Sequence, residues 1–325
     1  MGLFPLATMR TDVGVVRERN EDSAYVDERG RFVIVCDGMG GHGAGDVASQ
    51  MAVELVKRAM EEEAALFAAY ALDPTPDGRT HLAAQMRRIV EHANRVVFER
   101  SEREPELHQM GSTLELVAIC GAEAFIAHVG DSRTYLMRNG RAAQLTVDHT
   151  VAETMRRAGT IDAEEARVSP MRSVLSNAIG VTPTVTVELL RIELRPGDRL
   201  LVCSDGLHDY FTREELGAHA AAGDLDEALA RMIDHARTGG GHDNITGVLI
   251  EARTRPSGTS PPLRTLDPLE DEPTNPVSVP ADAAVPSPIG GMSDESISHI
   301  IDRTLRESSR PYTLAEIAAD TGKRN

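Results

Sequence analysis

The sequence predicts a layered α+β fold built on antiparallel sheets. Its predicted strands and helices come in blocks instead of alternating one by one, which favours an α+β protein over a doubly wound parallel sheet. Asn139-Gly140 lies between two short apolar runs and is a strong signal for a β-hairpin, which joins antiparallel strands. The chain has 325 residues, of which 41% are hydrophobic, enough for a domain with a sizeable core and additional segments.

The first part of the chain is expected to contain a central buried strand. Residues 32–36 form an unbroken apolar run with β-branched side chains, which is typical of a strand covered on both faces. Residues 11–17 and 23–26 are predicted to be strands joined by a polar turn. Apolar stripes predict two helices, at 45–63 and 79–103, with a loop at 73–79 between them.

The next part is expected to form an antiparallel meander, followed by a mixed segment of helices and strands. The predicted strands of the meander are 113–120, 124–129, 134–138 and 142–145. A polar helix from residue 151 is expected to stop at Gly159, because glycine commonly ends helices. The remaining predicted elements are strands 186–194 and 199–204, helices 212–221 and 225–237, and a last strand at 244–252.

Composition excludes several classes of protein. The net charge of -17 and a pI near 5.1 argue against a nucleic-acid partner, which would require a basic surface. The three cysteines lie far apart, with no spacing typical of zinc or disulfides. The first residues lack the features of a signal peptide, and no apolar run approaches the roughly 20 residues of a membrane span. A cytoplasmic protein without a membrane association is therefore expected.

Aspartates follow several of the predicted strands. Asp37 comes directly after residues 32–36 and is followed by a glycine-rich stretch, where a bare backbone can approach a ligand closely. The other aspartates at or near strand ends are Asp22, Asp131, Asp205, Asp209 and Asp243. Clustered carboxylates repel one another unless cations join them, and an all-oxygen set favours Mg²⁺ or Mn²⁺ over zinc. Alternatively, each aspartate caps a helix or forms an Asx-turn. That explanation suits any one of these aspartates, but it hardly accounts for all of them together.

Six short motifs occur in order along the chain. They are Thr11-Asp12-Val13-Gly14-Val15-Val16-Arg17 with Asn20-Glu21-Asp22, Asp37-Gly38-Met39-Gly40-Gly41-His42, Gly111-Ser112-Thr113, Val129-Gly130-Asp131-Ser132-Arg133, Cys203-Ser204-Asp205-Gly206-Leu207 and Asp243-Asn244-Ile245-Thr246. As a set they resemble the bacterial branch of the metal-dependent (PPM, type 2C) serine/threonine protein phosphatases, over about residues 8–252. The resemblance implies a four-layer sandwich of two antiparallel β-sheets flanked by helices.

The same resemblance implies a centre that holds two Mn²⁺ or Mg²⁺ ions, and a third, weaker ion in bacterial members. A water bridging the first two ions would attack phosphorus in line and hydrolyse phosphoserine or phosphothreonine monoesters. The implied ligands are Asp37 bridging both ions with the Gly38 carbonyl, Asp205 and Asp243 on one ion, Asp22 through water, and Asp131, Asp205 and Asp209 around the third ion.

Two further residues acquire catalytic roles from the resemblance. Arg17 matches the family's phosphate-binding arginine. A guanidinium suits that role, since it can hold a phosphate dianion with two hydrogen bonds. Arg19 is the alternative candidate for the same role. His42 matches the histidine proposed to protonate the leaving oxygen, with a passive loop residue as the alternative.

The resemblance also divides the chain. Residues 1–253 form the expected catalytic domain, with a flap at 148–180 in which Ser169 stands where relatives often carry histidine. Residues 254–291 are rich in Pro, Ser and Thr and are predicted to be a disordered linker. Residues 292–325 regain a helical pattern and are interpreted as an appendage that docks a partner protein, with a poorly ordered tail as the alternative.

The expected substrates are phosphorylated proteins, made by a serine/threonine kinase of the same cell. Two other functions are considered. One is a catalytically silent module that binds phosphoproteins, against which the intact ligand set argues. The other is a metal-dependent phosphodiesterase acting on nucleotides, against which the acidic balance and the scarcity of aromatic residues, 3% of the chain, argue.

Overall fold

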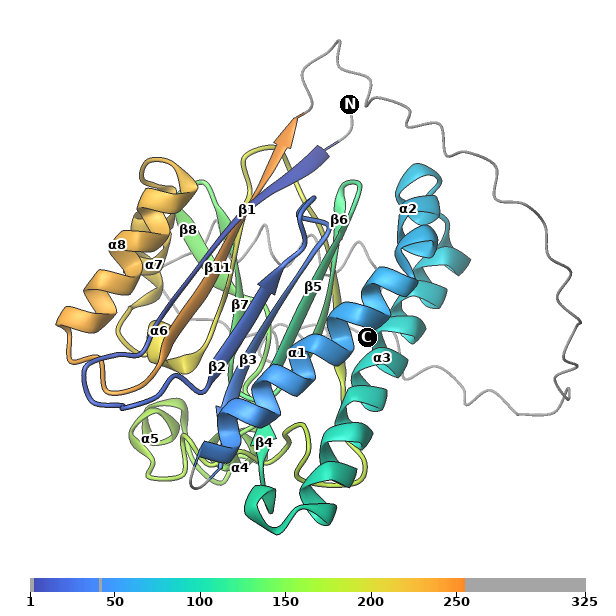
Figure 1. Cartoon of the computed structure of the whole chain (residues 1–325). Coiled ribbons are helices and arrows are strands. Elements are labelled where there is room, and N and C mark those ends of the chain that lie inside the picture. Colours follow the sequence, from blue (N-terminus) through green and yellow to red (C-terminus); the bar gives the residue numbers. More distant parts are fainter. Residues whose placement is uncertain (1–2, 41–42, 255–325) are drawn as a thin grey trace, which may run out of the picture.

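The computed structural model describes residues 3–40 and 43–254, which form two antiparallel β-sheets packed face to face with helices on both outer faces (Figure 1). The predicted α+β sandwich of four layers is therefore confirmed. Among these residues, no helix combines the length and the apolar character that a membrane span requires. His42, the linker from residue 255 and the C-terminal appendage lie outside the described residues.

The first sheet carries the central strand. Its strands, in spatial order, are β2 (Asp22–Val26), β3 (Phe32–Met39), β5 (Leu114–Cys120), β6 (Glu123–Val129) and β9 (Glu188–Glu193), with β4 (Gly111–Ser112) beside β3. Helices α1 (Ala44–Glu62), α2 (Ala64–Leu72) and α3 (Pro76–Arg103) cover its outer face, and a 3₁₀ turn, η2 (Pro105–Leu107), follows α3 (Figure 1).

The second sheet contains β1 (Leu3–Asp12), β11 (Ile245–Thr254), β10 (Arg199–Cys203), β7 (Arg133–Arg138) and β8 (Arg141–Gln144), in that spatial order. Helices α7 (Arg213–Ala221) and α8 (Leu225–Thr238) cover its outer face. Three short helices complete the described fold: α4 (Val151–Arg157), α5 (Ala163–Val168) and α6 (Asp205–His208). Figure 1 shows α4 and α5 beyond one end of the two sheets.

The core has three layers of apolar contact, and β3 contributes to two of them. Val33 and Val35 pack between the sheets, whereas Ile34 and Cys36 alternate with them and face the helices. All four side chains are fully buried, so the prediction of a strand covered on both faces is confirmed. Burial of each such side chain contributes about 1.5–3 kcal/mol to folding, and this fixes β3 firmly at the centre of its sheet.

Two sequence-based predictions about strands are wrong. Residues 11–17 do not form one strand, because β1 ends at Asp12 and Gly14 then takes a left-handed conformation (φ +80°). The four strands 113–145 do not form one meander, since β7 pairs with β10 of the other sheet and not with β6. Periodicity does not distinguish a hairpin connection from a crossing between sheets, and the chain crosses at residues 130–132.

Most predicted helix boundaries agree with the structure, but α3 starts earlier than predicted, and the short helices α2, α5 and α6 were not predicted. Helix α3 begins at Pro76, not at residue 79, because Thr75 accepts a hydrogen bond from the Gly78 N–H and proline suits the first helical turn. Helix α2 was not predicted at all, since it is apolar nearly all round and shows no stripe. Thr212, at the start of the predicted helix 212–221, caps α7 through a capping box with Glu215.

Candidate metal centre

The strand topology brings five of the predicted aspartates to one end of the two sheets. Asp22 at the start of β2 is the register partner of Asp37 near the end of β3. Asp205 lies two residues after the end of β10, Asp131 two residues after the end of β6, and Asp243 two residues before β11. Because neighbouring strands in both sheets are antiparallel, these strand ends and strand starts lie at the same end of the sandwich.

Hydrogen bonds tie the aspartate-bearing segments of the two sheets together. The Ser204 hydroxyl donates to Asp22 Oδ2 (2.8 Å) and accepts from the Thr246 backbone N–H (3.1 Å). Asn244 accepts from the Glu21 N–H (2.8 Å) and donates to the carbonyls of Val13 and Arg19. The loop that carries Arg17 is thereby fixed to the start of β11.

Thr113 connects Asp37 with the crossing between the sheets. The Asp37 N–H donates to the Thr113 hydroxyl (2.8 Å), which also shares a hydrogen bond with the Ser132 hydroxyl (2.7 Å). Gly130 sits in this crossing with φ +108°, and a Cβ on it would overlap the Thr113 side chain. The close approach that glycine allows therefore places Asp131 beside the other carboxylates.

The electrostatics of the cluster are those of a cation site. Burial raises the pKa of Asp37 well above its usual range, and the carboxylates of Asp22 and Asp205 raise it further. Burial and neighbouring carboxylates also raise the pKa values of Asp131 and Asp205. Burial raises the pKa of Asp22 to about 7, although Thr246 and Ser204 hydrogen-bond to its charged form. Like charges held together in this way disfavour ionisation until a cation neutralises them.

Two oxygens of the cluster have no partner among the described residues. Asp22 Oδ1 and Asp205 Oδ1 are buried and accept no hydrogen bond. Unsatisfied buried carboxylate oxygens are rare unless an ion or water binds them. An all-oxygen donor set of this kind fits Mg²⁺ or Mn²⁺.

Gly38 allows the backbone to lie against α1. A Cβ at Gly38 would overlap the carbonyl groups of Gly45 and Glu21, and the Gly38 N–H donates to the Glu21 carbonyl (3.1 Å). No larger residue fits here without moving β3 away from the start of α1.

Arg17 belongs to the cluster, and Arg19 lies beside it. Arg17 Nη2 donates to Asp243 Oδ2 (2.8 Å), and the Arg17 side chain is 48% exposed. Burial lowers the pKa of Arg17, but Asp243 and Glu21 raise it by more, so the guanidinium stays charged. The Arg19 guanidinium instead packs against Gly43 at the start of α1. The structure therefore places Arg17, not Arg19, beside a predicted metal ligand.

Asp209 lies one turn after Asp205 and is joined to the flap. Arg172 Nη1 donates to Asp209 Oδ2 (2.8 Å), and His208 Nδ1 lies 3.3 Å from Asp209 Oδ1. Burial raises the pKa of Asp209, but the neighbouring His208 and Arg172 lower it below its usual value. His208 also donates to the Asp131 carbonyl (3.1 Å), which connects two of the residues predicted for the third ion.

Sequence reasoning missed three residues whose side chains bond the site: Asn244, Arg172 and His208. Asn244 lies within a quoted motif, and its position directly after Asp243 could have drawn attention to it. For the contacts of Arg172 and His208 the sequence contains no local signal, because they depend on how the flap folds back.

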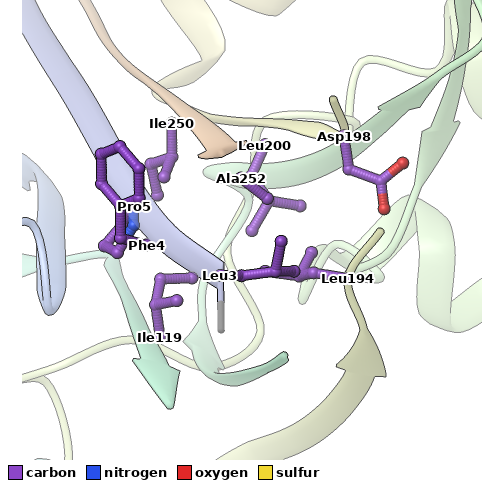
Figure 2. Close-up of a pocket in the computed structure, with 9 residues that line it drawn as sticks. All are labelled: Leu3, Phe4, Pro5, Ile119, Leu194, Asp198, Leu200, Ile250 and Ala252. Atoms are coloured by element: carbon purple, nitrogen blue, oxygen red, sulfur yellow. The ribbon is translucent and has the colours of Figure 1, made fainter. Parts of the chain in front are cut away.

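A small cavity at the other end of the sandwich is not part of this site. Figure 2 shows it between the two sheets, lined mainly by apolar residues that include Leu3, Ile119 and Ala252. Its volume of about 10 Å³ would hold at most a single water molecule. The Asp198 carboxylate at its rim is already bound by Arg138 (2.6 and 2.8 Å).

The raised pKa values predict how stability depends on pH without metal. Aspartates whose folded pKa is raised stabilise the fold at low pH, and that contribution is lost as the pH rises through the folded pKa. Asp22 with a pKa of about 7 and His128 with a pKa raised to about 9 both act in this direction between pH 6.5 and 8.5. In EDTA, we expect Tm to fall by about 5 °C over this interval.

With saturating Mn²⁺, Tm should be higher throughout, and the fall should be smaller, because the ions neutralise the carboxylates. Differential scanning calorimetry with and without EDTA measures both effects. A metal-free Tm that stays constant or rises over the interval would contradict the raised pKa values of Asp22 and His128.

An all-oxygen carboxylate cluster at one end of two packed antiparallel sheets defines this chain as a candidate divalent-metal protein. Comparison with known proteins identifies the protein family. Residues 16–249 match the sequence profile described as Protein phosphatase 2C, which covers more than half of the chain. The chain therefore belongs to the protein phosphatase 2C family.

Two bacterial proteins illustrate the similarity. Serine/threonine protein phosphatase PstP of Mycobacterium tuberculosis is 37% identical over 257 residues, which cover 78% of this chain and 46% of PstP. Thus the chain spans about half the length of that relative. Serine/threonine phosphatase stp of Listeria monocytogenes is 37% identical over 249 residues, which cover 75% of this chain and 95% of stp.

A crystal structure of the PstP catalytic domain, described as a complex with two manganese ions, is also similar. It superimposes with a TM-score of 0.66 at 34% identity, and the match covers 78% of this chain and 100% of that domain. The two-sheet fold that the sequence resemblance implied is therefore also the fold of this solved phosphatase domain.

Proposed function

We propose that this chain is a metal-dependent phosphatase that hydrolyses phosphoserine and phosphothreonine monoesters in proteins. The observation that carries the proposal is the convergence of Asp22, Asp37, Asp131, Asp205 and Asp243 at one sheet end, with buried oxygens that no described residue satisfies. Membership of the family, and the two manganese ions in the related PstP domain, support the same assignment.

The carboxylates would hold two Mn²⁺ or Mg²⁺ ions, through Asp37, Asp205 and Asp243 directly, the Gly38 carbonyl, and Asp22 through water. Asp131, Asp205 and Asp209 would hold a third. When bound, such ions lower the pKa of a water molecule to near neutrality and offset the negative charge of a phosphoryl group. This chain's residues supply the rest: a rigid carboxylate frame, a charged guanidinium and a flap.

Arg17 is proposed to bind the phosphate. Its guanidinium is half exposed at the edge of the cluster and stays charged at every physiological pH, so it can orient a phosphate dianion with two hydrogen bonds. His42 is proposed to donate the proton that the leaving serine or threonine oxygen needs. The substrates are proposed to be phosphoproteins made by a serine/threonine kinase in the same cytoplasm.

The test measures phosphate release from a phosphothreonine peptide by the full chain, with Mn²⁺ and with EDTA. We expect turnover that requires Mn²⁺, disappears in EDTA and returns when Mn²⁺ is restored. Faster turnover of bis-p-nitrophenyl phosphate than of the peptide would identify a phosphodiesterase instead. Peptide binding without any phosphate release would identify a regulatory module, and either result would overturn the proposal.

Replacement of Arg17 tests its role separately. In Arg17→Ala we expect KM for the phosphopeptide to rise about tenfold or more, the cost of a lost charge-assisted hydrogen bond, with a smaller change in kcat. Arg17→Lys should lie between, since an ammonium keeps the charge but not the planar pair of donors. Arg19→Ala is the matched control and should stay within about twofold of wild type. Equal effects of the two alanine variants would remove Arg17 from the phosphate site.

A further inference from the structure

His149 lies at the start of the flap and contacts the crossing that carries Asp131. The Gly130 backbone N–H donates to His149 Nδ1 (3.1 Å), and the His149 backbone N–H donates to the Gly130 carbonyl (2.7 Å). From the other end of the flap, the Asn177 side-chain amide donates to the same Nδ1 (3.0 Å), and the Ser176 N–H donates to the His149 carbonyl (2.8 Å).

These contacts determine the protonation state of the His149 ring. Two N–H donors point at Nδ1, so this atom must offer a lone pair, and the ring must be neutral with its proton on Nε2. The surroundings agree, because burial and the nearby His128 and Arg157 lower the pKa of His149 to about 3.

His128 is the charged partner in this arrangement. Its ring lies 4.6 Å from that of His149, and it bonds the Val147 carbonyl through Nε2 (2.9 Å) and Glu115 through Nδ1. Burial lowers the pKa of His128, but Glu115 outweighs burial and raises it to about 9. His128, His149 and Glu188 are close enough together to suggest a metal site. However, both nitrogens of His128 and Nδ1 of His149 already have partners, so the geometry is that of a hydrogen-bond network.

Asn177 extends the network across the base of the flap. Its amide donates to the Thr186 carbonyl (2.8 Å) and accepts from the Thr186 N–H (3.1 Å), which closes the loop between residues 177 and 186. The flap also carries Arg172, which bonds Asp209 beside the aspartate cluster. A change at His149 would therefore act on the Asp131 crossing and on the flap at the same time.

We propose that His149 is a positioning residue, whose neutral Nδ1 accepts from Gly130 and Asn177 together and so holds the flap in register with the loop that carries Asp131. This inference rests on the proposed function for its effect on catalysis. Its structural part, the attachment of the flap to that loop, does not depend on activity.

Replacement of His149 by Asn or by Gln tests whether a hydrogen-bond acceptor at the position of Nδ1 is required, or whether any polar side chain of similar size is enough. In His149→Asn the amide oxygen can reach the position of Nδ1 and keep the Gly130 hydrogen bond. In His149→Gln the amide reaches the position of Nε2 instead. His149→Leu removes the acceptor altogether. His92→Leu is the matched control, because His92 is exposed on α3 and forms none of these contacts.

The first measurement is the rate of tryptic cleavage of the full chain in EDTA, followed by mass spectrometry of fragments that end at Arg167 or Arg172, both exposed in the flap. We expect cleavage about tenfold faster in His149→Leu and His149→Gln, since flap opening no longer breaks two hydrogen bonds. His149→Asn and His92→Leu should stay within about twofold of wild type. If Asn and Gln behave alike, the proposal is overturned, and this comparison remains decisive should the Leu variant fail to fold.

The second measurement is the Mn²⁺ concentration that gives half-maximal phosphate release. We expect it to rise about fivefold in His149→Gln and to change little in His149→Asn, in parallel with the cleavage rates. A shifted cleavage rate with an unchanged Mn²⁺ requirement would overturn the coupling to Asp131. If the wild-type chain releases no phosphate, the proposed function fails, whereas the cleavage comparison still decides whether His149 attaches the flap.

Discussion

Replacement of Asp37 by asparagine is expected to reduce kcat for p-nitrophenyl phosphate by about a thousandfold or more, since metal ions contribute several kcal/mol to transition-state stabilisation. Asp37 is the centre of the cluster: the carboxylates of Asp22, Asp205, Asp131 and Asp243 all raise its pKa, after burial itself. An amide cannot bridge two cations as a carboxylate does. Asp205→Asn should have a similar effect, because Asp205 is proposed for two ion sites.

The same substitution should stabilise the metal-free protein. The neutral amide removes a repelling charge from a buried cluster, and the backbone bonds of Asp37 to Thr113 are untouched. We therefore expect Tm in EDTA at pH 8 to be equal to or above that of wild type, together with a loss of Mn²⁺ binding in calorimetric titration. A loss of activity with greater stability separates a ligand from a structural residue.

Asp226→Asn is the matched control for this experiment. Asp226 is exposed on α8, where it bonds Arg10 and Thr8 on the outer face of the second sheet. Its replacement should leave both kcat and Mn²⁺ binding unchanged. Wild-type turnover in Asp37→Asn would show that the metal assignment is wrong.

The second large effect is expected from Gly206→Ala. Gly206 follows Asp205 at the start of α6, and a Cβ on it would overlap the carbonyl oxygen of Asn244 and lie 3.3 Å from the Asp243 Cβ. The added methyl group must push α6 away from the start of β11, which carries Asp243. Overpacking of this kind costs about 1–3 kcal/mol, and here it also separates two proposed ligands.

We expect Gly206→Ala to lower Tm by about 5 °C and to weaken Mn²⁺ binding at the same time. Gly159→Ala is the control, because Gly159 has φ +71° but nothing within 4 Å of a Cβ. Gly159→Ala should lower the free energy of unfolding by about 1 kcal/mol, from backbone strain alone, and leave Mn²⁺ binding unchanged. If both variants lose stability but neither changes Mn²⁺ affinity, the spacing between Asp205 and Asp243 does not matter for the ions.

Several elements were predictable from the sequence because their signals are local. The apolar run of β3 is buried on both faces as predicted, and the capping box at Thr212 begins α7 where the side chains indicate it. The alternation and end signals of such elements depend on residues a few positions apart. Such a prediction fails where a glycine turns the backbone. At Gly14 the chain takes a left-handed conformation, and the strand predicted at 11–17 ends early.

The sequence by itself determined the donor chemistry of this protein: oxygen ligands on aspartates that follow apolar strands, beside glycines that leave the backbone open. Only the tertiary structure decided which of these groups meet. It places β7 in the other sheet from β6, so that the crossing delivers Asp131 to the cluster, and it folds the flap back so that His149 and Arg172 reach the same region. The physical reason is that such contacts join residues far apart in the chain, and their energy depends on packing between sheets that no local pattern encodes.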